Sequence, residues 1–186
     1  MNIKPTIVLS AVTTIISALL IVAHNLTYVD TSGIITEKML QKCTSLMGEA
    51  EYSIVSDWKA YGYAIDKPDS ISKLIVGSNG KLAFEIIANG YNKGGLDLLV
   101  SMTADGAVDG IEVVSITETP GLGTNVNNAD FLSLFGGIDS EAVIVKKTPA
   151  ASNEVEAVTG ATYSSKGVAA AVNTAIKTYA EMGVSR

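Results

Sequence analysis

The stretch that decides the fold is residues 73–116, KLIVGSNGKLAFEIIANGYNKGGLDLLVSMTADGAVDGIEVVSI. Four apolar runs within it are rich in Val, Ile and Leu and are separated by glycine-containing turns, a pattern typical of strands. They predict strands at Lys73–Gly77, Leu82–Ala88, Leu96–Met102 and Val108–Ile116. Asn-Gly at 79–80 and Asp-Gly at 105–106 are strong hairpin signals. We therefore expect a mainly antiparallel sheet.

Helical patterns lie on both sides of this strand region. Apolar residues between Ile34 and Met47 recur at helical spacing and predict an amphipathic helix in which Cys43 is a core thiol. Beyond the strands, the sequence predicts a short helix at Val126–Phe135, a short strand at Ala142–Val145 and a longer helix at Ser164–Met182. Helices that flank a mainly antiparallel sheet indicate an α+β fold.

The N-terminal segment has the composition of a membrane helix. Residues 6–23 carry no charge, and with the uncharged continuation to Val29 the segment can cross the roughly 30 Å of a hydrocarbon core. A cleaved secretory signal is the alternative, but no small-x-small cleavage site follows the apolar centre. We expect a transmembrane anchor at 1–29, an amphipathic connecting helix at 30–50 and one domain at 51–186.

The charges beside the apolar run predict its orientation. Lys4 precedes the run and Asp30 follows it, and positive charge collects on the cytoplasmic side of a membrane helix. We therefore expect a single-pass protein of the cell membrane, with a cytoplasmic N-terminus and an extracytoplasmic domain.

The overall composition argues against several functional classes. A formal net charge of -6 and a pI of about 4.7 argue against a nucleic-acid partner. One His and one Cys leave no cluster with metal-ligand spacing and no Ser/His/Asp or Cys/His arrangement. We therefore expect no protein-bound metal and no catalytic residue that acts on a substrate.

The first segment that could form a site is Glu118–Thr124, ETPGLGT, which follows an apolar strand. A type II Pro-Gly turn with Gly121 at positive φ would explain it without a ligand. The alternative is a rigid loop whose backbone approaches a flat ligand, because Gly121 and Gly123 carry no side chains. The spacing leaves both interpretations open.

The second such segment is Glu156–Gly167, EAVTGATYSSKG, which precedes the last predicted helix. Thr162, Ser164 or Ser165 could serve as the N-cap of that helix. A helix start also suits an anion, because its free N–H groups and positive end favour a phosphate. The spacing matches neither a phosphate-binding P-loop nor a GxGxxG dinucleotide site, so nucleotide hydrolysis and a Rossmann site are unsupported.

Together the two segments resemble the FMN-binding domain family. Thr159–Thr162 is similar to the end of that family's flavinylation motif, roughly Asp-x-x-(Ser/Thr)-Gly-Ala-Thr, whose last threonine carries FMN through a phosphoester. Glu118–Gly123 resembles the family's Glu-Thr-Pro-Gly-Leu-Gly loop. One departure is Glu156, which stands where the family usually has Asp and keeps the charge while adding one methylene.

The resemblance implies a flavoprotein in which Thr162 carries FMN covalently and the Thr119–Gly123 loop packs on the flavin ring. Tyr91, before a glycine turn, is a candidate to border the ring, although packing is the commoner role of such a residue. The other cofactor-binding residues that the resemblance implies are Glu118, Thr119, Gly121, Leu122, Gly123, Thr159, Gly160, Ala161, Ser164 and Lys166.

Within the family, the chain resembles electron-transfer subunits of Rnf-type complexes, the membrane-bound ferredoxin:NAD+ oxidoreductases coupled to Na+ or H+ translocation. The resemblance implies an electron relay with integral membrane and peripheral partner subunits, and a flavin transferase that attaches the FMN. The alternatives are a free-standing membrane-anchored extracytoplasmic flavoprotein, the C subunit of a Na+-translocating NADH:quinone reductase, and an anchored binding module without redox function.

Overall fold

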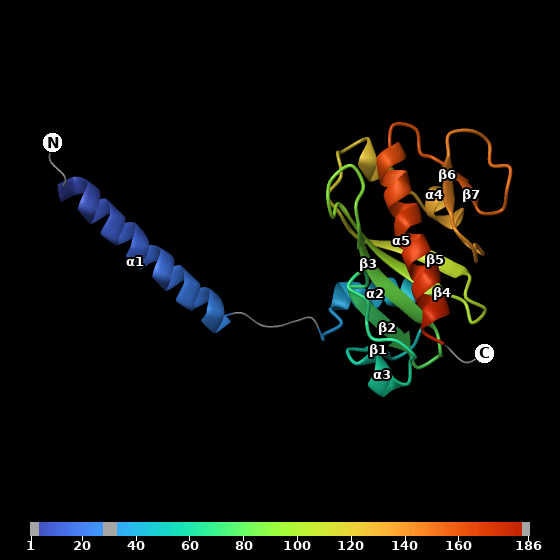
Figure 1. Ribbon diagram of the computed structural model, residues 1–186, viewed down its shortest axis with the longest axis horizontal. Helices are drawn as coiled ribbons and strands as arrows, with labels where there is room; N and C mark the ends of the chain where they lie inside the picture. Colours follow the sequence, from blue (N-terminus) through green and yellow to red (C-terminus); the bar gives the residue numbers. More distant parts are fainter. Residues whose placement is uncertain (1–3, 28–32, 184–186) are drawn as a thin grey trace. The chain divides into compact units, whose positions relative to one another are not determined.

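The computed structural model describes residues 4–27 and 33–183, which fall into two compact units divided after Gly33 (Figure 1). The first unit contains helix α1, Lys4–Thr27. Its apolar part, Ile7–Thr27, spans 21 residues and is the one helix among the described residues that is long and apolar enough to cross a membrane. Residues 1–3, 28 and 29 of the predicted anchor and residues 30–32 of the predicted connecting segment lie outside the described residues.

The second unit is built on a five-stranded antiparallel sheet in the order β1-β2-β3-β4-β5. Strands β2 to β5 have the bounds predicted from the sequence: Lys73–Gly77, Leu82–Ala88, Leu96–Met102 and Val108–Ile116. Strand β1, Tyr52–Ile54, and the short helix α3, Trp58–Tyr61, come from residues 51–70, for which the sequence predicted no element. The predicted α+β class is confirmed.

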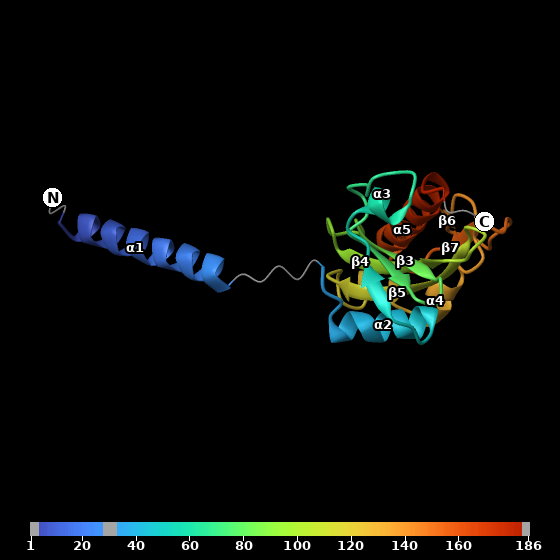
Figure 2. The ribbon, with the colours of Figure 1, turned by 90° about the horizontal axis from the view of Figure 1, so that it is seen from below.

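One helix covers each face of the sheet, as Figure 2 shows. Helix α5, Thr162–Glu181, packs on β3 and β4 with Val168, Val172 and Ala175 fully buried. Helix α2, Glu37–Met47, places Cys43 and its neighbours against Ile75, Ala83 and Leu99 on the opposite face, so the predicted amphipathic helix and core thiol are both present. The strands are therefore held between two apolar layers, which gives the loops at the sheet ends a rigid support.

Between β5 and α5, one prediction needs correction and one strand was not predicted. The helix predicted at Val126–Phe135 is divided into a 3-10 turn η1, Gly123–Val126, and a short helix α4, Ala129–Ser133. The division has a local cause, because the Asn128 side chain accepts a hydrogen bond from the Asp130 N–H and starts a new helix there. The predicted strand near 142–145 is β6, Val143–Val145, and it pairs in parallel with β7, Glu154–Glu156, which the sequence did not predict.

Candidate functional site

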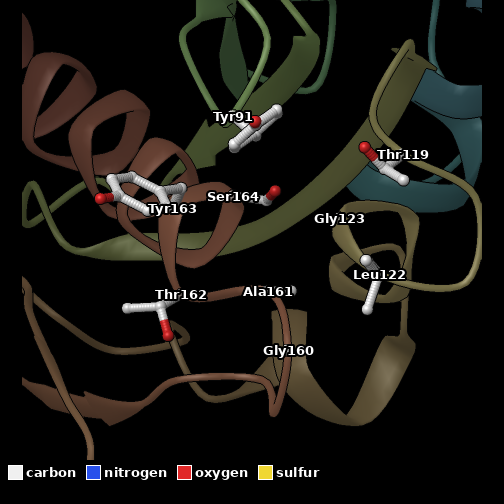
Figure 3. A pocket seen from close by; sticks show the side chains of 9 residues that line it. All are labelled: Tyr91, Thr119, Leu122, Gly123, Gly160, Ala161, Thr162, Tyr163 and Ser164. Atoms are coloured by element: carbon white, nitrogen blue, oxygen red, sulfur yellow. The ribbon is translucent and has the colours of Figure 1, made fainter.

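The two segments singled out in the sequence meet at one end of the sheet and enclose an open cavity of about 420 Å³ (Figure 3). The loop after β5 lies on one side of the cavity, and the start of α5 lies on the other. The β3–β4 connection contributes a third wall through Tyr91. The lining residues are Tyr91, Thr119, Leu122, Gly123, Gly160, Ala161, Thr162, Tyr163 and Ser164.

The loop after β5 is held by its own turn. The Leu122 N–H donates to the Thr119 carbonyl at 3.2 Å, and Gly121 has φ of +72°, as the type II turn predicted. The Gly121 N–H also donates to the Thr124 hydroxyl at 3.0 Å. The predicted turn is therefore present, and it leaves the Leu122 side chain 51% exposed beside the cavity.

A second glycine turn leads into α5. The Ala161 N–H donates to the Val158 carbonyl at 2.9 Å, and Gly160 between them has φ of +78°. A Cβ on Gly160 would approach Leu122 Cδ2 to 3.2 Å, so the two glycine turns are in contact across the cavity. The absence of a side chain at residue 160 keeps that contact close.

The predicted N-cap of the last helix is wrong. The helix begins at Thr162, the cap position is Ala161, and no side chain caps the helix. Ser165 does not cap the helix, because its hydroxyl donates to the Ala161 carbonyl at 3.0 Å and accepts from the Val158 N–H at 3.1 Å. The first N–H groups of a helix have no acceptor within it, and here they belong to Thr162 and the two cavity-lining residues that follow.

Glu118 lies beneath the cavity and is 5% exposed. Its carboxylate accepts hydrogen bonds from the Ser164 hydroxyl at 2.6 Å and from the N–H groups of Tyr91 and Asn92, both at 3.0 Å. Burial by itself would raise the pKa of Glu118, but the bonds from Ser164, Asn92 and Tyr91 outweigh it and lower the pKa below its ordinary value. Glu118 is therefore an ionised carboxylate inside the protein.

The structure brings most of the sequence-predicted site residues to this cavity. Seven of them line it, and Glu118 lies below it. The other three, Gly121, Thr159 and Lys166, are exposed and lie outside the lining.

Two tyrosines add aromatic surface to the cavity. Tyr91 is 73% exposed and Tyr163 is 67% exposed, and their rings meet edge to face at a centroid distance of 6.2 Å. The sequence pointed to Tyr91 as a candidate, but Tyr163 was not predicted. The available signal was a large aromatic residue within a run of small and hydroxyl side chains, because such a residue at a helix start either packs inward or meets a ligand.

The cavity fits FMN by three observations. Its volume lies within the usual range for small-molecule sites. The exposed side chains of Tyr91, Tyr163 and Leu122 suit a flat ring system, and the uncapped start of α5 suits a phosphate.

The described residues contain no group of three or more His, Cys, Asp or Glu side chains that could hold a metal ion.

Comparison with known proteins defines the class of this site. Residues 90–177, which include both loops and most of α5, match the FMN-binding domain family. The G subunit of the Na+-translocating ferredoxin:NAD+ oxidoreductase complex of Acetobacterium woodii is 31% identical over 180 residues, covering 89% of this chain and 87% of that protein. The G subunit of the proton-translocating ferredoxin:NAD+ oxidoreductase complex of Clostridium ljungdahlii is 31% identical over 170 residues, covering 89% and 85%.

The protein is thus an FMN-binding-domain protein. It belongs to the family of the G subunits of ion-translocating ferredoxin:NAD+ oxidoreductase complexes, as the resemblance in the sequence implied. Among solved structures, a crystal structure of Shewanella oneidensis NqrC aligns with a TM-score of 0.42 and 19% identity over 60% of this chain and 61% of that chain.

Proposed function

We propose that this protein carries FMN covalently on Thr162 and relays electrons within an ion-translocating ferredoxin:NAD+ oxidoreductase complex. One observation carries the proposal: the Thr162 side chain lines the cavity at the uncapped start of α5. A phosphoester on this hydroxyl would lie beside N–H groups that have no helical acceptor and at the positive end of the helix. The family membership supports the same cofactor.

The chain's own residues would bind and orient the flavin. Thr162, Gly160, Ala161 and Ser164 surround the proposed phosphoester, with Thr159 and Lys166 on the nearby surface. The Thr119–Gly123 turn would border the ring, opposite the two tyrosines. The flavin itself supplies the capacity to accept and release electrons. Because Leu122 and the tyrosine rings are exposed, the bound ring would remain accessible to a partner's cofactor.

The family and the first helix support a proposal for the location and the partners of the protein. We propose that residues 1–29 anchor the chain in the cell membrane, that residues 30–50 connect to the domain and that residues 51–186 form the FMN-binding domain outside the cytoplasm. Lys4 before the apolar run and Asp30 after it support this orientation. The partners are the integral membrane and peripheral subunits of the complex, and a flavin transferase attaches the FMN.

Intact mass and peptide mapping of the membrane-extracted protein test the covalent site. The expected result is an added mass of FMN minus one water on the peptide that contains Thr162, and its loss in Thr162→Ala. Thr174→Ala is the matched control, because Thr174 lies on the same helix and its hydroxyl bonds only to the Ala170 carbonyl. An unmodified Thr162 in protein from its native host, where the flavin transferase is present, would refute the proposal.

Protease accessibility and copurification test the location and the partners. Added protease should cleave the domain in intact spheroplasts and spare it in inside-out vesicles. Mild detergent extraction should recover the protein with integral membrane subunits. A protein that purifies alone in its flavin-bound form would favour a free-standing flavoprotein over a component of a complex.

A further inference from the structure

The buried carboxylate of Glu118 joins the three chain segments that form the cavity. Glu118 follows β5, while its donors Tyr91 and Asn92 belong to the β3–β4 connection and its donor Ser164 belongs to α5. We call these four residues the Glu118 network. Two of its members, Tyr91 and Ser164, line the cavity, and the Glu118 side chain is bonded to the segments that carry both of them.

Backbone encloses this carboxylate closely. A Cβ on Gly123 would lie 2.6 Å from Glu118 Oε2, and a Cβ on Gly90 would lie 2.7 Å from Oε1. A Cβ on Gly95 would overlap Oε1. Any side chain at these positions would displace the carboxylate, so the glycines leave a space shaped for it.

The charge on Glu118 is balanced by dipoles. Its three donors are neutral groups, and no ion pair involves it among the described residues. A buried anion that has no counter-ion keeps its full charge, and at the low effective dielectric constant of a protein it acts on neighbouring groups more strongly than it would in water. Since Ser164 both lines the cavity and donates to Glu118 Oε2 at 2.6 Å, this field acts one side chain below the cavity floor.

We propose that Glu118 is a positioning residue for the flavin site, whose negative charge also makes the bound flavin harder to reduce. This inference rests on the proposed function. Reduction adds negative charge at the site, and a fixed anion below it opposes that change. For a unit charge within roughly 10 Å at an effective dielectric constant of about 20, Coulomb's law gives roughly a tenfold change in the redox equilibrium.

Redox titration of the flavin-loaded full chain against a reference dye tests the charge. Glu118→Gln should shift the oxidised-to-reduced ratio roughly tenfold toward the reduced form at a given potential. Glu118→Asp keeps the charge and should stay close to the unmodified protein. Glu181→Gln makes the same change at the far end of the 20-residue α5 and should have no effect. A Glu118→Gln titration that coincides with that of the unmodified protein would overturn the electrostatic role.

Hydrogen exchange tests the positioning role without flavin. In a Thr162→Ala background, Glu118→Gln should speed exchange at the Tyr91 and Asn92 amides, which lose a charged acceptor. Unchanged exchange at both amides would overturn that role. Failure of the proposed function would appear separately, as an unmodified Thr162 in the native protein, and the exchange measurement would still decide whether the network holds the loop.

Discussion

Gly167 on α5 lies close to the loop that carries Tyr91. A Cβ at residue 167 would lie 2.5 Å from the Asn89 carbonyl oxygen and 2.6 Å from Leu96 Cδ1. The first distance is about 0.9 Å shorter than the 3.4 Å at which ordinary contacts begin. The Asn89 oxygen belongs to the backbone and has no rotamer that would relieve the overlap, so Gly167→Ala must push α5 away from the sheet.

Two opposing effects set the size of this change. Alanine is favoured over glycine within a helix by about 1 kcal/mol. Overpacking a well-filled core typically costs about 1–3 kcal/mol, and contact with a backbone atom places Gly167→Ala near the upper end. We therefore expect a net loss of about 2 kcal/mol, which lowers Tm by roughly 4–8 °C in a chain of this size.

Thermal unfolding of the detergent-solubilised chain, followed by circular dichroism, measures the effect. Ala170→Gly is the matched control, because Ala170 is exposed on the same helix and should lose only the propensity of about 1 kcal/mol. Gly167→Ala should also reduce the flavin content on Thr162, since the start of α5 moves with the helix. A Gly167→Ala protein as stable as the unmodified one would refute the close packing on which this reasoning rests.

Three further predictions concern groups away from the cavity. Burial, followed by the Glu85 carboxylate, raises the pKa of Asp97 from 3.8 to about 6 against the lowering effect of Lys73, so ionised Asp97 reduces stability at neutral pH. Asp97→Asn should thus stabilise the protein by about 1–3 kcal/mol at pH 7.5, and a Tm series should show the gain disappearing below about pH 4. Burial, followed by the Glu85 carboxylate, also raises the pKa of Cys43 to about 11. Iodoacetamide at pH 8 should therefore label this thiol only in denaturant, because the thiolate is the reactive form. Rapid labelling of the native chain would contradict the burial of Cys43. Trp58 is buried beside Phe84, so its fluorescence should be blue-shifted in the native chain and move to longer wavelength on unfolding; a native emission like that of free tryptophan would contradict its burial.

Strands β2 to β5 could be predicted to the residue because each is marked twice, by an apolar run and by a glycine turn. Strand β7 has neither mark, since Val155 is its one apolar residue and no glycine turn stands beside it. The division of the helix at Asn128 was readable in principle, because Asn is a strong N-cap residue. Its apolar neighbours Val126 and Phe131 suggested one continuous helix instead.

The cavity residues were accessible to sequence reasoning for a different reason. Loops that need glycine, proline and small hydroxyl residues depart from the composition of strands and helices, so both segments were visible. The burial of Glu118 could not be predicted from the sequence, because carboxylates are mostly exposed and no neighbouring residue marks this one as buried. Its environment requires donors from residues 91, 92 and 164, which only the folded chain brings together.

The topology explains why these segments meet. In the antiparallel sheet, β3 and β5 run in the same direction, so the connection after β3 and the loop after β5 leave from the same end. Helix α5 packs across β3 and β4 and begins at that end, beside both loops (Figure 1). The cavity walls are therefore three chain connections held by one rigid sheet and one helix. A flavin carried by Thr162 would then be fixed by the scaffold at its phosphate while its ring lay among exposed side chains. This combination suits a relay, because the cofactor stays in place and its reactive edge remains open to partner proteins.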